Sequence, residues 1–148
     1  MTNQKIVALS TAISSALLVL IFSLIGISEL IWVGFAGCTS FFISENKLRV
    51  SLLSNLLGIT ICTAIIAIVN LHPTILVNSV ITGILAGVMM LFAKSKYING
   101  SSAFLAGLIT FAFSSTLLNL SMISAILFGN LFGLLTHYFI ILFSRGKK

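Results

Sequence analysis

Long apolar runs separated by short polar stretches make up almost the whole chain. A helix needs about 20 residues to cross the hydrocarbon core of a bilayer, which is about 30 Å thick. Four of the runs reach that length, whereas the second and the fifth hold roughly 16 residues each, so either four or six helices span the membrane. The runs are Ile6–Gly26, Ser28–Ile43, Val50–Val69, Thr74–Ala93, Ser101–Thr116 and Asn119–Phe143.

The runs are continuous rather than alternating, which excludes a transmembrane β-barrel, whose strands alternate apolar and polar residues. Composition agrees, because 59% of the residues are hydrophobic and only 7% are charged. A soluble domain carries about a quarter charged residues, so this chain has too few charges to cover a water-facing surface. The sequence therefore predicts an all-α, polytopic membrane protein. Cys38 and Cys62 lie inside runs, and we interpret them as buried small residues rather than a disulfide or a metal pair.

The positions of the basic residues decide between four and six helices. If all six runs span the membrane and the N-terminus is cytoplasmic, every Lys and Arg falls on the cytoplasmic side, as the positive-inside rule expects. If the second and fifth runs were re-entrant, Lys47 and Arg49 would move outside. We therefore predict six transmembrane helices with both termini in the cytoplasm. The eight basic residues are Lys5, Lys47, Arg49, Lys94, Lys96, Arg145, Lys147 and Lys148.

Two short segments recur at matching positions in the two halves of the chain, about 6–70 and 74–143. Ala36–Ser44 aligns without gaps with Ala106–Ser114, and Asn55–Gly58 is echoed by Asn130–Gly133. Each half holds three helices, and because three is odd, the second half must lie upside down relative to the first. We therefore predict a single transmembrane domain over residues 1–148, built as a 3+3 inverted repeat.

The segment Trp32–Phe42 reads Trp-Val-Gly-Phe-Ala-Gly-Cys-Thr-Ser-Phe-Phe. It resembles the YcdZ-like family of bacterial inner-membrane proteins, a domain-of-unknown-function family in which a similar segment sits early in the chain. In that family a Gly-x-Phe-x-Gly segment recurs in the second half, and its counterpart here is Ser102–Gly107, where serine replaces the first glycine. The resemblance extends over nearly the whole chain. It implies a location in the inner membrane and no known substrate.

Small and polar residues inside the runs fall on single helix faces, at spacings of three or four residues. They could serve helix packing, because small residues let backbones approach and hydroxyls or amides bond across helices. They could equally line a polar path, and the two amides at related positions favour a central site. We interpret Gly83 and Gly87 as a packing pair and His137 as an interfacial residue. The candidate substrate-path residues are Gly37, Ser40, Ser44, Asn55, Gly107, Thr110, Ser114 and Asn130.

The sequence offers little for catalysis. Its only acids are Glu29 and Glu45, both at run ends, so no carboxylate lies within the membrane for proton or sodium coupling. No phosphate-binding loop or zinc-protease motif is present. We expect no enzyme activity, no cofactor, no metal site and no nucleic-acid partner. The first hypothesis is a small transporter or channel for a small neutral or weakly charged solute, with a homo-oligomer as one arrangement. The alternative is a membrane scaffold or accessory subunit without a substrate; both have the lipid bilayer as partner.

Overall fold

The computed structural model describes residues 3–71, 74–91, 95–113 and 120–145. The described part is all-α, as predicted, and the helix bounds lie within a few residues of the apolar runs. A short 3-10 turn, η1 (Ser28–Leu30), precedes the second helix. The six α-helices are α1 (Asn3–Ile25), α2 (Ile31–Ile43), α3 (Leu48–Leu71), α4 (Ile75–Leu91), α5 (Gly100–Phe113) and α6 (Leu120–Arg145).

Three of the helices, α1, α3 and α6, are long and apolar enough to cross a membrane. The helices α2 and α5 have only 13 and 14 residues. At 1.5 Å per residue each is about 20 Å long, shorter than a bilayer core. Large apolar side chains cover the outside of the molecule, among them Ile75 at 89% exposure and Leu91 at 82%. A surface of this kind is solvated by lipid rather than water, so the chain is a membrane protein.

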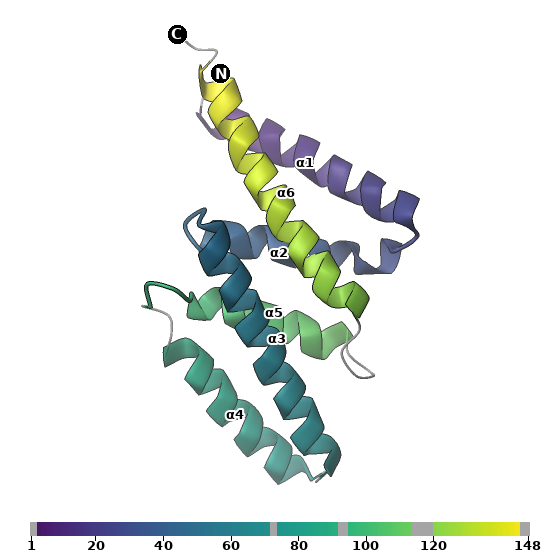
Figure 1. Ribbon diagram of the computed structural model, residues 1–148, viewed down its shortest axis with the longest axis vertical. Coiled ribbons are helices and arrows are strands. Elements are labelled where there is room, and N and C mark those ends of the chain that lie inside the picture. Colours follow the sequence, from purple (N-terminus) through teal and green to yellow (C-terminus); the bar gives the residue numbers. More distant parts are fainter. Residues whose placement is uncertain (1–2, 72–73, 92–94, 114–119, 146–148) are drawn as a thin grey trace.

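Successive helices run in opposite directions (Figure 1). The start of α1, the turn between α2 and α3, residues 95–99 and the end of α6 all lie toward the left of the view. The turn between α1 and α2, the end of α3 and the start of α6 lie toward the right. The segments that contain Lys5, Lys47, Lys96 and Arg145 are therefore on the same side of the molecule.

The helices form two bundles that do not correspond to the two halves of the sequence. In one bundle α6 packs against α1 and α2; in the other α3 packs against α4 and α5. Each half thus gives its third helix to the bundle of the other half. The two bundles meet where α2 contacts α3 and α5, and where α3 contacts α6.

Glycines bring α2 and α6 into backbone contact. A Cβ atom added to Gly129 would overlap the carbonyl oxygen of Gly34 and lie 3.0 Å from the Cα of Gly37. One added to Gly133 would lie 2.7 Å from the Cβ of Phe41. Side chains larger than hydrogen would push the helices apart, and close approach of this kind is how helices associate in lipid. We call this contact the α2–α6 glycine seam.

The α3–α5 glycine seam has the same construction in the other bundle. A Cβ atom added to Gly58 would overlap the carbonyl oxygen of Ala103 and lie 3.0 Å from the backbone nitrogen of Gly107. One added to Gly107 would lie 3.3 Å from the carbonyl oxygen of Gly58. Each bundle therefore has one pair of helices whose backbones touch.

Gly83 and Gly87 of α4 differ from these glycines. A Cβ atom added at either position meets nothing within 4 Å. The packing that we predicted for this pair is therefore absent among the described residues of the chain. The physical reason is that α4 lies at the edge of its bundle and turns its glycine face outward.

Candidate functional site

A line of buried polar side chains follows the boundary between the two bundles. Their exposures are 2% or less, although all but one of them sit inside apolar helices and the remaining one, Ser44, directly follows α2. Among the described residues, five hydrogen bonds with side chains and one contact between two hydroxyl oxygens cross from one bundle to the other along this line. We call it the polar seam, formed by Ser40, Ser44, Ser51, Asn55, Ser102 and Asn130.

One part of the polar seam links α2, α3 and α6. Ser40 of α2 donates to Oδ1 of Asn55 in α3 over 2.6 Å, and its hydroxyl oxygen lies 3.0 Å from that of Ser51. Ser51 in turn donates to Oδ1 of Asn130 in α6. The Nδ2 group of Asn130 donates to the carbonyl oxygen of Ile126 in its own helix. Both amides thus bond directly to a neighbouring helix.

The hydrogens available do not satisfy all of these contacts. Each serine hydroxyl has one hydrogen. Ser40 gives its hydrogen to Asn55 and Ser51 gives its own to Asn130, so no hydrogen is left for the contact between the two hydroxyls. The Nδ2 group of Asn55 has no partner within the described part of the chain.

A half-turn of the Asn55 amide about its last bond would rearrange the network. Nδ2 of Asn55 would then donate to Ser40, and Ser40 could donate to Ser51, which already donates to Asn130. The unpartnered atom would become the amide oxygen of Asn55. In both orientations one atom of this amide is left unpaired, so Asn55 is the member of the seam with an unpaired buried side-chain atom in the described part of the chain.

The other end of the polar seam lies at the start of α5. The hydroxyl oxygens of Ser44 and Ser102 are 2.9 Å apart, and Ser102 also donates to the carbonyl oxygen of Ser40. Asn99 caps α5 by accepting from the backbone N–H of Ser102 over 3.1 Å. Its Nδ2 group donates to the carbonyl oxygen of Ile43, at the end of α2. The α5 cap is therefore also a bond between the bundles.

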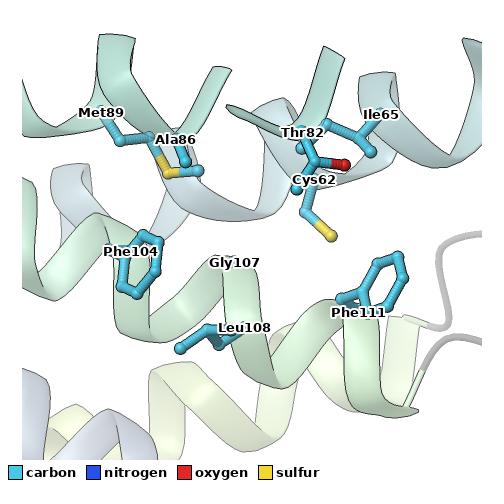
Figure 2. Close-up of a pocket in the computed structure, with 9 residues that line it drawn as sticks. All are labelled: Cys62, Ile65, Thr82, Ala86, Met89, Phe104, Gly107, Leu108 and Phe111. Atoms are coloured by element: carbon cyan, nitrogen blue, oxygen red, sulfur yellow. The ribbon is translucent and has the colours of Figure 1, made fainter. Parts of the chain in front are cut away.

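A groove, separate from the polar seam, lies between α3, α4 and α5 (Figure 2). It has a volume of about 220 Å³, and its lining includes Cys62, Met89, Phe104, Gly107 and Phe111. The surface is almost entirely apolar, which suits an acyl chain or an apolar side chain better than a polar solute. Of the predicted path residues, Gly107 lines this groove.

Comparison with protein families gives one match. The model described as a protein of unknown function (DUF1097) matches residues 8–140. The chain belongs to this family. The family description assigns no activity, as the resemblance implied, and it does not carry the YcdZ-like name. No curated protein and no solved structure matches the chain.

The structure of this DUF1097 chain brings together four of the eight predicted path residues, Ser40, Ser44, Asn55 and Asn130. Gly37 and Gly107 lie in the two glycine seams instead. Thr110 is buried, but its hydroxyl donates to the carbonyl oxygen of Ala106 in its own helix. Positions named in the sequence analysis that lie outside the described residues are Ala93, Lys94, Ser114, Thr116, Asn119, Lys147 and Lys148.

Sequence reasoning missed two kinds of residue in these contacts. Ser102 and Asn99 join the bundles, and the signal for them was the Asn-x-x-Ser spacing of a helix cap just before the fifth run. Gly34 and Gly129 are the close-contact glycines of α2 and α6. The spacings Gly34-x-x-Gly37 and Gly129-x-x-x-Gly133 were the signal for them.

Proposed function

We propose that the chain is a small transporter or channel of the inner membrane, with no enzymatic step, and that solute passes along the polar seam. The observation that carries this proposal is the contrast between the polar seam and the two glycine seams. Hydrogen bonds between hydroxyls and amides can be exchanged for bonds to water or solute at little cost. Backbone contacts between glycines have no such replacement. The bundle boundary is thus the place where the molecule can open.

The pairing of helices supports an inverted repeat. Interchanging the two halves converts the pair α2–α6 into the pair α5–α3, and these are the pairs with glycine seams. Gly37 meets Gly129 in one seam, and Gly107 meets Gly58 in the other. This correspondence relates Gly58 to Gly129, which lies about one helical turn before Gly133. The recurring segments Ala36–Ser44 and Ala106–Ser114 then correspond as they align in the sequence. The segments Asn55–Gly58 and Asn130–Gly133 are displaced by one helical turn.

Loop charge supports six spans with both termini in the cytoplasm. Lys47 and Lys96, from loops that are far apart in sequence, line one polar cavity. The short helices α2 and α5 lie between longer ones in Figure 1, and short helices at matching positions near a central site are typical of transporters with inverted repeats.

The groups in the polar seam favour a small neutral or weakly charged solute. Its side chains are hydroxyls and amides, and none carries a charge. Asn55 is where opening costs least, because one atom of its amide already lacks a partner. Subunits could associate through the open Gly83 and Gly87 face of α4, and we include a homo-oligomer in the proposal for this reason.

Uptake into proteoliposomes tests the proposal, with a panel of small amides, amines, organic acids and sugars. We expect at least one solute to enter faster than into empty liposomes. Asn55→Leu and Asn130→Leu should abolish that flux while the protein still inserts and stays folded. Asn70→Leu is the matched control, because Asn70 is an exposed amide near the far end of α3. Equal flux in all three variants would refute a path through the seam.

A scaffold without substrate is the second candidate. The observation in its favour is that both amides, Asn55 and Asn130, bond directly to neighbouring helices. A scaffold predicts that Asn130→Leu destabilises the protein and that the parent protein carries no solute of the panel. The same uptake and stability measurements therefore distinguish the two functions.

A further inference from the structure

A polar cavity of about 210 Å³ lies where the polar seam reaches the Lys-bearing side of the molecule. Its lining includes Ser44 and Lys47 from the end of α2 and the following turn, and Lys96 and Asn99 from the segment before α5. It is therefore built from both bundles.

The charges around this cavity are mainly positive. Lys47 and Lys96 carry two positive charges, and Glu45 is the only acid in the lining. Lys47 is paired with Glu45, with 2.7 Å between Nζ and the carboxylate oxygen. Lys96 has no carboxylate partner in the part of the chain that the structure describes, and its Nζ lies 5.9 Å from the centre of the Tyr97 ring. One cation thus borders the cavity without a counter-ion.

Two helix N-termini add to this positive field. Helix α3 begins at Leu48, directly after Lys47, and α5 begins at Gly100, directly after Asn99. The N-terminal end of a helix carries partial positive charge and free N–H groups, which favour anions. The helix ends reinforce a preference that the lysines and the cavity already establish.

Glu45 is held at this cavity in an unfavourable backbone conformation. It has φ +56° and follows α2 in a Schellman turn, in which Asn46 N–H donates to the carbonyl of Phe41 and Glu45 N–H to that of Phe42. Glycine is the usual residue at this position, because a side chain is disfavoured in the left-handed region. Unlike glycine, Glu45 supplies a carboxylate at this position, and the carboxylate accepts a hydrogen bond from Nζ of Lys47.

From this geometry we infer that the cavity binds a small oxyanion, with Lys96 and Lys47 as its cationic partners and Glu45 as an internal competitor. The ligand chemistry is a sulfate- or phosphate-like group, either free or as the headgroup of an anionic phospholipid. Binding displaces the Glu45 carboxylate from Lys47. Oxyanion binding in the cavity is an equilibrium property and does not require the proposed transport.

Calorimetric titration of sodium sulfate into the full chain in detergent tests the site. We expect Lys96→Gln to weaken sulfate binding by about three- to ten-fold, because a charge-assisted contact is lost. Glu45→Gln should tighten binding by about two- to five-fold, because the exposed competitor is removed. Lys5→Gln is the control, since Lys5 is an exposed lysine at the start of α1 that does not line the cavity.

If Glu45 only stabilised the turn after α2, Glu45→Gln would not tighten sulfate binding. Absence of sulfate binding, equal affinity in the Lys96→Gln and Lys5→Gln variants, or weaker binding in Glu45→Gln would each overturn the inference. Adding phosphatidylglycerol to the micelles distinguishes the two ligand sources. A headgroup site requires the lipid to compete with sulfate in the parent protein, whereas a site for free oxyanions leaves the sulfate affinity unchanged.

Discussion

The glycine seams and the polar seam join helices in opposite ways. In the glycine seams, Gly58 and Gly129 place their backbones against the carbonyl oxygens of Ala103 and Gly34, and no larger residue fits without movement. In the polar seam, serine and asparagine side chains hold the bundles together through hydrogen bonds. The first kind of contact depends on shape, and the second depends on partners that water can replace.

This difference teaches which parts of the molecule move together. A bundle closed by backbone contact behaves as one body, because the contact has no second arrangement of similar energy. A boundary made of hydroxyls and amides has alternatives, and the half-turn of the Asn55 amide is one of them. We therefore expect the two bundles to move as two bodies along the polar seam, rather than as the two halves of the sequence.

The largest effect is expected at the glycine seams. Gly58→Ala and Gly129→Ala should each lower the free energy of unfolding by about 1–3 kcal/mol, because the new methyl group overlaps a backbone carbonyl. Gly83→Ala and Gly87→Ala are matched controls in open space, and in the monomeric protein they should be neutral or stabilise by roughly 0.5–1 kcal/mol. Denaturant unfolding in micelles measures all four. Equal losses at the four positions would contradict the packing described for the seams.

A smaller effect is expected for single bonds in the polar seam. Ser51 donates to Asn130, and the double-mutant cycle of Ser51→Ala with Asn130→Ala should give a coupling of about 0.6 kcal/mol, the average for such bonds in a membrane protein, and no more than about 1.7 kcal/mol. Asn55→Ala should destabilise less than Asn130→Ala, because one atom of the Asn55 amide already lacks a partner. A coupling near zero would remove the distinction between this seam and ordinary contacts.

The smallest effect concerns the ion pair at the edge of the polar seam. Lys47 donates a hydrogen bond to Glu45 and adds a nearby positive charge, which together lower the pKa of the Glu45 carboxyl from its ordinary value of 4.5. A carboxyl with a lowered folded-state pKa contributes stability above its unfolded pKa and loses it as the pH falls through the folded value.

The parent protein should therefore melt slightly above Glu45→Gln at pH 7. The difference should shrink as the pH falls below 4.5 and vanish once Glu45 is protonated. Thermal unfolding of both proteins between pH 7 and pH 3 checks this. A difference that does not change with pH would show that the pair adds nothing to stability.

The helices could be predicted from the sequence because apolar length alone defines them. The predicted run Val50–Val69 corresponds to α3 (Leu48–Leu71), and Ser51, Asn55, Gly58 and Cys62, which share one face of that helix, are buried. Spacing on a helix fixes which residues share a face, so the sequence could place Ser40, Ser44, Asn55 and Asn130 on contact faces, whereas their role in a substrate path stays a prediction.

The exchange of α3 and α6 between the bundles could not be predicted. Every helix is apolar on most sides, so a stripe identifies a contact face without identifying its partner. Gly37 and Ser40 lie three residues apart on α2, yet Gly37 meets α6 while Ser40 meets α3. Whether a residue serves helix packing or belongs to the polar seam therefore depends on which helix lies next to it.

The central claim is that the polar seam opens to water while the bundles stay closed. Cysteine accessibility in membrane vesicles tests it directly, in a background where Cys38 and Cys62 are replaced by alanine. Ser40→Cys and Ser51→Cys place a thiol in the seam, and Ala125→Cys places one in the α1–α2–α6 bundle, where Ala125 is 0% exposed. We predict that a small water-soluble methanethiosulfonate reagent labels the two seam thiols and leaves the thiol at position 125 unmodified. Labelling of position 125 as fast as positions 40 and 51, or no labelling at any of the three, would contradict the account.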